Sequence, residues 1–159
     1  EYISDNDGLS WHLLNLLLYT MWHKKNAELC PITTSLLKKI KSVKSAYFSI
    51  LEPGKHIPPH KGPYKGIIRY QLAISVPKKG ECKILVDGKP YFWKEGESVL
   101  FDDTYTHEVV NNTSEYRVAL LLDVKRTMPG FFMRQYDSFV FRLIQLLVIL
   151  NNTFSKSKV

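Results

Sequence analysis

Two of the five histidines stand out because of the segments that hold them. His60 ends the run His56-Ile-Pro-Pro-His60, in which two prolines remove backbone freedom. His107 follows the acidic segment 101–106 and precedes an apolar run. If both imidazoles lie at one mouth of a barrel, they form a pair of nitrogen donors for a transition metal. Spacing alone leaves open that they are two unrelated loop histidines.

A carboxylate is missing where a third metal ligand is expected. In many iron enzymes with two histidines and one carboxylate, the carboxylate stands two residues after the first histidine. Gly62 occupies that position here. Asp102 and Asp103, just before His107, are candidates to orient its imidazole by hydrogen bonding. A turn or a β-bulge explains the same two aspartates equally well.

Arg117 lies ten positions after His107, in the strongly apolar segment 116–122. A guanidinium that points into a barrel is costly unless an anion pairs with it. The local sequence places no acidic residue beside it, so a bound dicarboxylate is a candidate partner. Alternation along a strand also allows Arg117 to face solvent.

Composition restricts the class of protein that must position these residues. The 159 residues suit one domain, and 45% hydrophobic residues can fill a core. Two cysteines are too few for a disulfide framework or a zinc site of several thiolates. The net charge of +7 is compatible with nucleic acid, an anionic lipid surface or an acidic ligand. The basic residues are dispersed without a recognition motif, so nucleic-acid binding is not expected.

The order of short apolar runs and turn residues predicts a mainly β protein. Asp87-Gly88 between two β-rich runs is a strong hairpin signal. Seven or so strands at this spacing indicate a sandwich or a barrel; the runs are 46–51, 67–76, 82–86, 90–93, 98–101, 108–110 and 116–124. Residues 11–22 fit strand or helix, 31–41 predict a helix, and a helical tail follows Pro129-Gly130.

The segments 46–64, 93–96, 101–109 and 116–124 resemble the aspartyl/asparaginyl β-hydroxylase family, in the same order and spacing. The resemblance covers about Trp11 to Met128. It implies a double-stranded β-helix (jelly-roll, cupin-like) with an N-terminal helix and a C-terminal helical tail. Residues 1–128 would form the dioxygenase domain with N-terminal flanking elements, and 129–159 the amphipathic tail.

The family is one of Fe(II)- and 2-oxoglutarate-dependent dioxygenases that use O₂, and the resemblance assigns roles to single residues. It makes His60 and His107 the iron ligands. Arg117 and Ser49 would bind the distal carboxylate of 2-oxoglutarate. Gln71 replaces a histidine that commonly contacts this co-substrate, and Arg69 would face the substrate.

The substrate branch stays open. Segments 29–37, 68–72 and 86–93 are most similar to bacterial enzymes that hydroxylate an acyl chain of lipid A, whereas Gly62 agrees with the peptidyl aspartyl/asparaginyl hydroxylases. A non-catalytic cupin-like binding module and a membrane-associated structural protein are the other two hypotheses.

The tail and the location of the protein are expectations of the same kind. Arg134, Arg142 and the terminal lysines accompany an apolar helix face, which would suit peripheral contact with an anionic membrane. A helix packed across the barrel or against a second subunit has the same pattern. A cytoplasmic protein is expected, with possible association at the cytoplasmic face of a membrane.

Overall fold

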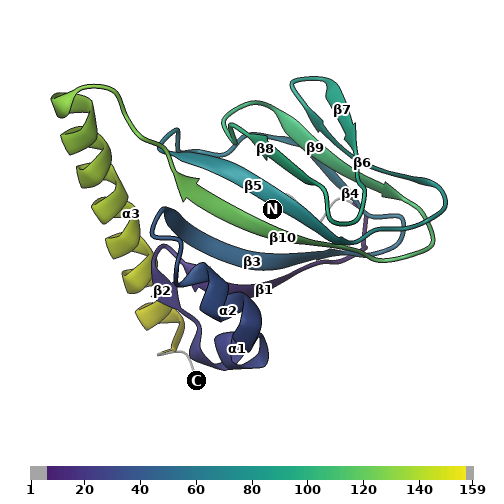
Figure 1. Ribbon diagram of the computed structural model, residues 1–159, viewed down its shortest axis with the longest axis horizontal. Helices are drawn as coiled ribbons and strands as arrows, with labels where there is room; N and C mark the ends of the chain where they lie inside the picture. Colours follow the sequence, from purple (N-terminus) through teal and green to yellow (C-terminus); the bar gives the residue numbers. More distant parts are fainter. Residues whose placement is uncertain (1–6, 157–159) are drawn as a thin grey trace.

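The computed structural model describes residues 7–156 and shows two antiparallel sheets that face each other, with the helices outside them (Figure 1). The larger sheet has the order β2-β1-β3-β10-β5-β8 and the smaller sheet the order β4-β9-β6-β7. The larger sheet consists of β1 (Trp11–Leu18), β2 (Met21–Trp22), β3 (Val43–Leu51), β5 (Ile67–Ser75), β8 (Ser98–Phe101) and β10 (Arg117–Lys125). The smaller sheet consists of β4 (His56–His60), β6 (Glu81–Val86), β7 (Lys89–Phe92) and β9 (His107–Asn112). This is the jelly-roll architecture that the sequence predicts.

The larger sheet is covered on both faces, and the alternation of side chains along its strands explains this. Ala46 and Leu120 face outward and pack in a cluster with Leu37 of helix α2 (Pro31–Leu37), beside α1 (Lys24–Leu29). Leu51 and Ala73 face inward and pack against side chains of the smaller sheet. The inner face therefore also carries the polar residues that alternate with these apolar ones.

The hairpin predicted at Asp87-Gly88 is confirmed. Asp87 has φ 50° and Gly88 φ 73°, and Val86 pairs with Lys89 across this two-residue turn. Positive φ at both central residues is the backbone of the tight turns that match strand twist, and Asp-Gly accommodates it. The turn fixes the register of β6 against β7.

Three segments differ from the sequence-based expectation. Residues 11–22, left between strand and helix, form β1 and β2. The proline-rich segment before His60 is itself the strand β4, at the edge of the smaller sheet, where missing N–H groups at Pro58 and Pro59 are tolerated. The helix expected over 31–41 ends at Leu37.

The tail forms the helix α3 (Phe131–Lys156), which stands at the end of the sandwich where β10 finishes (Figure 1). Phe141 is buried against Tyr19 and Tyr64, and the side chain of Gln145 donates to the carbonyl oxygen of Tyr19 over 3.0 Å. No helix among residues 7–156 is long and apolar enough to cross a membrane. The terminal Lys158 lies outside the described residues.

Candidate active site

The structure brings His60 and His107 together: His60 ends β4 and His107 begins β9. The two are direct cross-strand partners in the β4–β9 ladder, and their ring centroids are 4.2 Å apart. A bulge between Ile57 and His60 bends β4 just before the histidine. Cross-strand pairing, which the sequence does not reveal, is what makes two distant histidines one site.

Both imidazoles use the same nitrogen for the protein backbone. Nδ1 of His60 lies 2.8 Å from the carbonyl oxygen of Pro58, and Nδ1 of His107 lies 2.9 Å from that of Tyr105. A carbonyl oxygen only accepts, so Nδ1 carries the proton and Nε2 keeps its lone pair. Burial lowers the pKa of His107 below its usual value, and the nearby His60 acts in the same direction. A neutral imidazole with a free Nε2 is the form that binds a metal.

Asp102 and Asp103 turn out to have different tasks. Asp102 forms the turn, because its Oδ1 accepts from the backbone N–H of Thr104 over 3.0 Å. Asp103 is buried, and its Oδ1 lies 3.4 Å from Nε2 of His107. The turn explanation therefore holds for Asp102. Because the proton of His107 is on Nδ1, the carboxylate of Asp103 lies beside the lone pair of Nε2 and accepts no hydrogen bond from it.

Asp103 fills the space in which a side chain at position 62 would lie. A Cβ placed on Gly62 would be 1.7 Å from Oδ2 of Asp103. The backbone N–H of Gly62 also donates to the carbonyl oxygen of Asp103 over 2.8 Å. The missing carboxylate after His60 and the buried carboxylate before His107 are thus two sides of one packing arrangement. Among residues 7–156, no group of three His, Cys, Asp or Glu side chains is arranged to hold a metal.

Arg69 connects this pair of histidines to the larger sheet. Its guanidinium lies 2.8 Å from Oδ1 of Asp103 and 3.1 Å from Oδ1 of Asp123. Burial alone lowers the pKa of Arg69, but Tyr47 and the two carboxylates outweigh burial and raise it. The family resemblance assigns Arg69 to the substrate, and that role stays a prediction. In the structure two acidic side chains hold its guanidinium in place.

Arg117 lies deeper, on the same inner face, and it is 1% exposed. Its Nη1 donates over 3.3 Å to Oγ of Ser49, and its Cζ lies 5.3 Å from the centre of the Trp93 ring. No ion pair links Arg117 to an acidic side chain among the described residues. Burial lowers its pKa to about 10, which the thiol of Cys82 only partly opposes. Arg117 therefore points inward as predicted, with a charge that no carboxylate of the described residues balances.

The surroundings of Arg117 suit a small dicarboxylate. Nε of Arg117 and Nε1 of Trp93 are buried donors without a hydrogen-bond partner among the described residues, and Oε1 of Gln71 is a buried acceptor without one. Oγ of Ser49 accepts from Trp11 over 2.9 Å as well as from Arg117, which leaves its own hydrogen to donate. Buried polar groups normally have partners, so unpaired donors around an unbalanced arginine indicate a site for an anionic ligand. The residues present fit 2-oxoglutarate at this point.

Several contributors to this site were missed from the sequence. Asp123, Tyr47 and Trp11 all contact or neighbour the arginines or Ser49. Asp123 had a usable signal, because it stands six residues after Arg117 in one strand, and a period of two places both on the same face. Trp11 had none, because its contact depends on the pairing of β1 with β3.

The fold and the site together define a cupin-like jelly roll with a pair of histidines on the smaller sheet and a buried arginine on the facing sheet. Residues 1–127 match the family described as aspartyl/asparaginyl beta-hydroxylase. The chain belongs to this family. It is 40% identical over 121 residues to an ornithine lipid ester-linked acyl 2-hydroxylase of Rhizobium tropici, which covers 76% of this chain and 43% of that protein.

A second relative carries the name of the family itself. The aspartyl/asparaginyl beta-hydroxylase of Homo sapiens is 34% identical over 116 residues, which is 67% of this chain and 15% of that protein. The chain thus spans less than half of the length of either relative. Among solved structures, a cupin domain of an XRE family transcriptional regulator from Enterobacter cloacae has a TM-score of 0.51 at 16% identity, over 74% of this chain and 98% of that one. That likeness concerns the fold alone.

Proposed function

We propose that this chain is an Fe(II)- and 2-oxoglutarate-dependent dioxygenase that hydroxylates an unactivated C–H bond of a lipid acyl chain, of the lipid A type. The observation that carries the proposal is Arg117, a buried arginine without a carboxylate partner among the described residues, on the sheet that faces the histidine pair. A non-catalytic module that binds an acidic ligand would use Arg117 and Ser49, but it has no need of His60 and His107 as well. Family membership and the rhizobial relative support the same reaction class.

In this proposal each residue has one task. His60 and His107 would hold iron through Nε2, because Nδ1 of each is engaged by a carbonyl oxygen. Arg117 and Ser49 would hold the distal carboxylate of the co-substrate. When bound, iron and 2-oxoglutarate would together activate O₂ for attack on an unactivated C–H bond, with 2-oxoglutarate oxidised to succinate and CO₂. Arg69 acts as a positioning residue, since it fixes Asp103 beside His107.

The acyl substrate rests on different support. The rhizobial relative is described as acting on a lipid-linked acyl chain. The surface of α3 is apolar and the chain carries a net charge of +7, which favours peripheral contact with an anionic membrane over an aspartyl or asparaginyl peptide. Gly62 is the observation that favours the peptide substrate, through the resemblance to that branch.

The test measures succinate formed from 2-oxoglutarate with Fe(II), with and without lipid A-type acyl substrates. His60→Ala and His107→Ala should each abolish stoichiometric binding of Fe(II) and turnover. His56→Ala is the matched control, because His56 lies in the same strand but pairs with Glu108 over 2.8 Å. Stoichiometric iron binding by the double alanine variant would refute the site. If an aspartyl peptide is hydroxylated while the lipid mass profile stays unchanged, the lipid substrate is refuted and the peptide substrate is supported.

A further inference from the structure

Helix α3 leaves most of its apolar side chains uncovered. Asp137 and Phe141 are its buried side chains among residues 131–150. Ten large apolar side chains in this range are between 44% and 86% exposed: Phe131, Phe132, Met133, Tyr136, Phe139, Leu143, Leu146, Leu147, Ile149 and Leu150. An apolar surface of this extent on a single helix indicates a partner.

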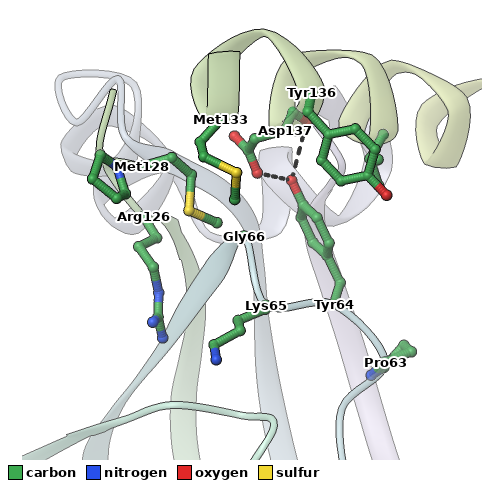
Figure 2. Close-up of a pocket in the computed structure, with 11 residues that line it drawn as sticks. Pro63, Tyr64, Lys65, Gly66, Arg126, Met128, Met133, Tyr136 and Asp137 are labelled. Carbon is green, nitrogen blue, oxygen red and sulfur yellow. Dashed lines mark hydrogen bonds between the residues drawn. The ribbon is translucent and has the colours of Figure 1, made fainter. Parts of the chain in front are cut away.

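An apolar pocket of about 580 Å³ lies between α3 and the rim of the sandwich (Figure 2). Its lining includes Met128, Met133 and Val140, and Figure 2 shows the two methionines facing the same space. The segment Pro63–Gly66, which lines the pocket, begins three residues after His60. Arg126, which also lines it, pairs with Asp102, and the next residue in sequence, Asp103, lies beside His107. These two connections place the pocket on the side of the histidine pair.

The side of this pocket against α3 is fixed by a buried polar contact. Tyr64 donates its hydroxyl hydrogen to Oδ1 of Asp137, as Figure 2 shows. Oδ2 of Asp137 lies 3.1 Å from Nζ of Lys125. Asp137 is thus already paired twice, and its negative charge is balanced by Lys125. It does not neutralise the other basic residues nearby.

A second pocket, of about 390 Å³, shares Arg126, Met128 and Asp137 with the first. Its lining adds four further basic side chains and no further acidic one: Lys41, Lys44, Lys125 and Arg134. Arg126 is paired with Asp102. We refer to this second pocket as the basic pocket.

Three of the charges in the basic pocket have no acidic partner among the described residues. Lys41, Lys44 and Arg134 take part in none of the ion pairs that residues 7–156 form. Nζ of Lys44 donates over 2.8 Å to the backbone carbonyl oxygen of Lys41, which holds the Lys44 ammonium beside that segment. Several cationic residues that line one pocket favour an anion with several oxygen atoms.

We propose that the basic pocket binds the phosphate-bearing headgroup of an anionic membrane lipid. The proposal rests on the lipid substrate proposed above and names the part of the chain that recognises it. A lipid fits better than a soluble phosphate ester, because the basic pocket opens beside an apolar pocket and the exposed apolar face of α3. Bound there, the headgroup places its acyl chain beside the mouth of the site.

The test is binding of the 159-residue chain to vesicles of phosphatidylglycerol and phosphatidylcholine, compared with vesicles of phosphatidylcholine alone. The variant is the triple change Lys41→Gln, Lys44→Gln, Arg134→Gln. Each basic residue near an anionic surface strengthens binding roughly fivefold, so the variant should bind the anionic vesicles on the order of a hundredfold more weakly. Binding to the neutral vesicles through α3 should not change. The melting temperature of the variant shows whether it is folded.

The matched control changes three exposed lysines far from the pocket, Lys78→Gln, Lys79→Gln and Lys89→Gln, which removes the same charge. An equal loss of binding in this control would overturn the proposal in favour of a diffuse charge effect. Tight binding of soluble glycerol 3-phosphate with no preference for anionic vesicles would also overturn it. His60→Ala should bind vesicles as the unchanged chain does. A failure of the iron assignment is thereby separated from a failure of the headgroup site.

Discussion

Two arginines on one sheet face, Arg117 fully buried and Arg69 largely buried, should respond to the same substitution with opposite sign. Arg117 has no carboxylate partner among the described residues, whereas Arg69 is held between Asp103 and Asp123. Replacement of Arg117 by methionine removes an uncompensated buried charge. Replacement of Arg69 by methionine leaves two buried carboxylates without their cation. We expect Arg117→Met to stabilise the ligand-free protein and Arg69→Met to destabilise it.

The size of the first effect follows from the pKa of Arg117. Burial lowers it to about 10, well below its usual value. Folding therefore disfavours the charged form by about 3 kcal/mol at every pH below 10, and the penalty disappears as the pH rises above 10 to the usual pKa of arginine. Methionine loses the contact with Trp93, so we expect a net gain of about 1–3 kcal/mol at pH 7. For a domain of this size that is about 2–10 °C in melting temperature.

The second effect is a loss. Breaking a buried pair by removal of one partner costs about 3–5 kcal/mol, so Arg69→Met should melt at least about 6 °C lower than the unchanged chain. Both variants replace an arginine by methionine on the same face of the sheet, so each serves as the control for the other.

The assay is thermal unfolding with and without 2-oxoglutarate in the presence of Mn(II), which does not start the oxidation. Saturating co-substrate at 100 times its Kd should stabilise the unchanged chain by about 2.7 kcal/mol. Loss of a buried charge-assisted pair costs about 2–5 kcal/mol, so this stabilisation should vanish in Arg117→Met. A lower melting temperature for Arg117→Met, together with an intact response to 2-oxoglutarate, would refute the reasoning.

Two further predictions concern the mouth of the site. Gly62→Ala should destabilise the fold by roughly 1–3 kcal/mol in urea unfolding, because its Cβ would lie 1.7 Å from Oδ2 of Asp103. Adding Asp103→Gly should restore part of this stability, and no recovery would contradict the clash. The metal-free protein should lose stability as the pH falls below about 6.5, because the lowered pKa of His107 lets the unfolded chain bind the proton first. His107→Gln should reduce this slope between pH 7.5 and 5.5, and an unchanged slope would assign it to other groups.

Features set by local sequence could be predicted, and features set by strand pairing could not. The dipeptide Asp87-Gly88 readily adopts the positive φ of a tight turn, so these two residues were enough to predict the β6–β7 hairpin. The pairing of His60 with His107 depends on β4, which the sequence did not reveal as a strand because prolines usually interrupt one. An edge position removes that objection, but edge position is a property of the whole sheet.

The polar side chains of the inner face show the same limit. Arg69 and Asp123 are 54 positions apart and meet because β5 and β10 pair in one register, with these residues directly opposite. A shift by one residue would turn Arg69 outward and leave Asp123 buried alone. The energetic cost of that error helps to fix the register. The contacts that arrange the candidate site thereby also select the pairing of the strands that carry it.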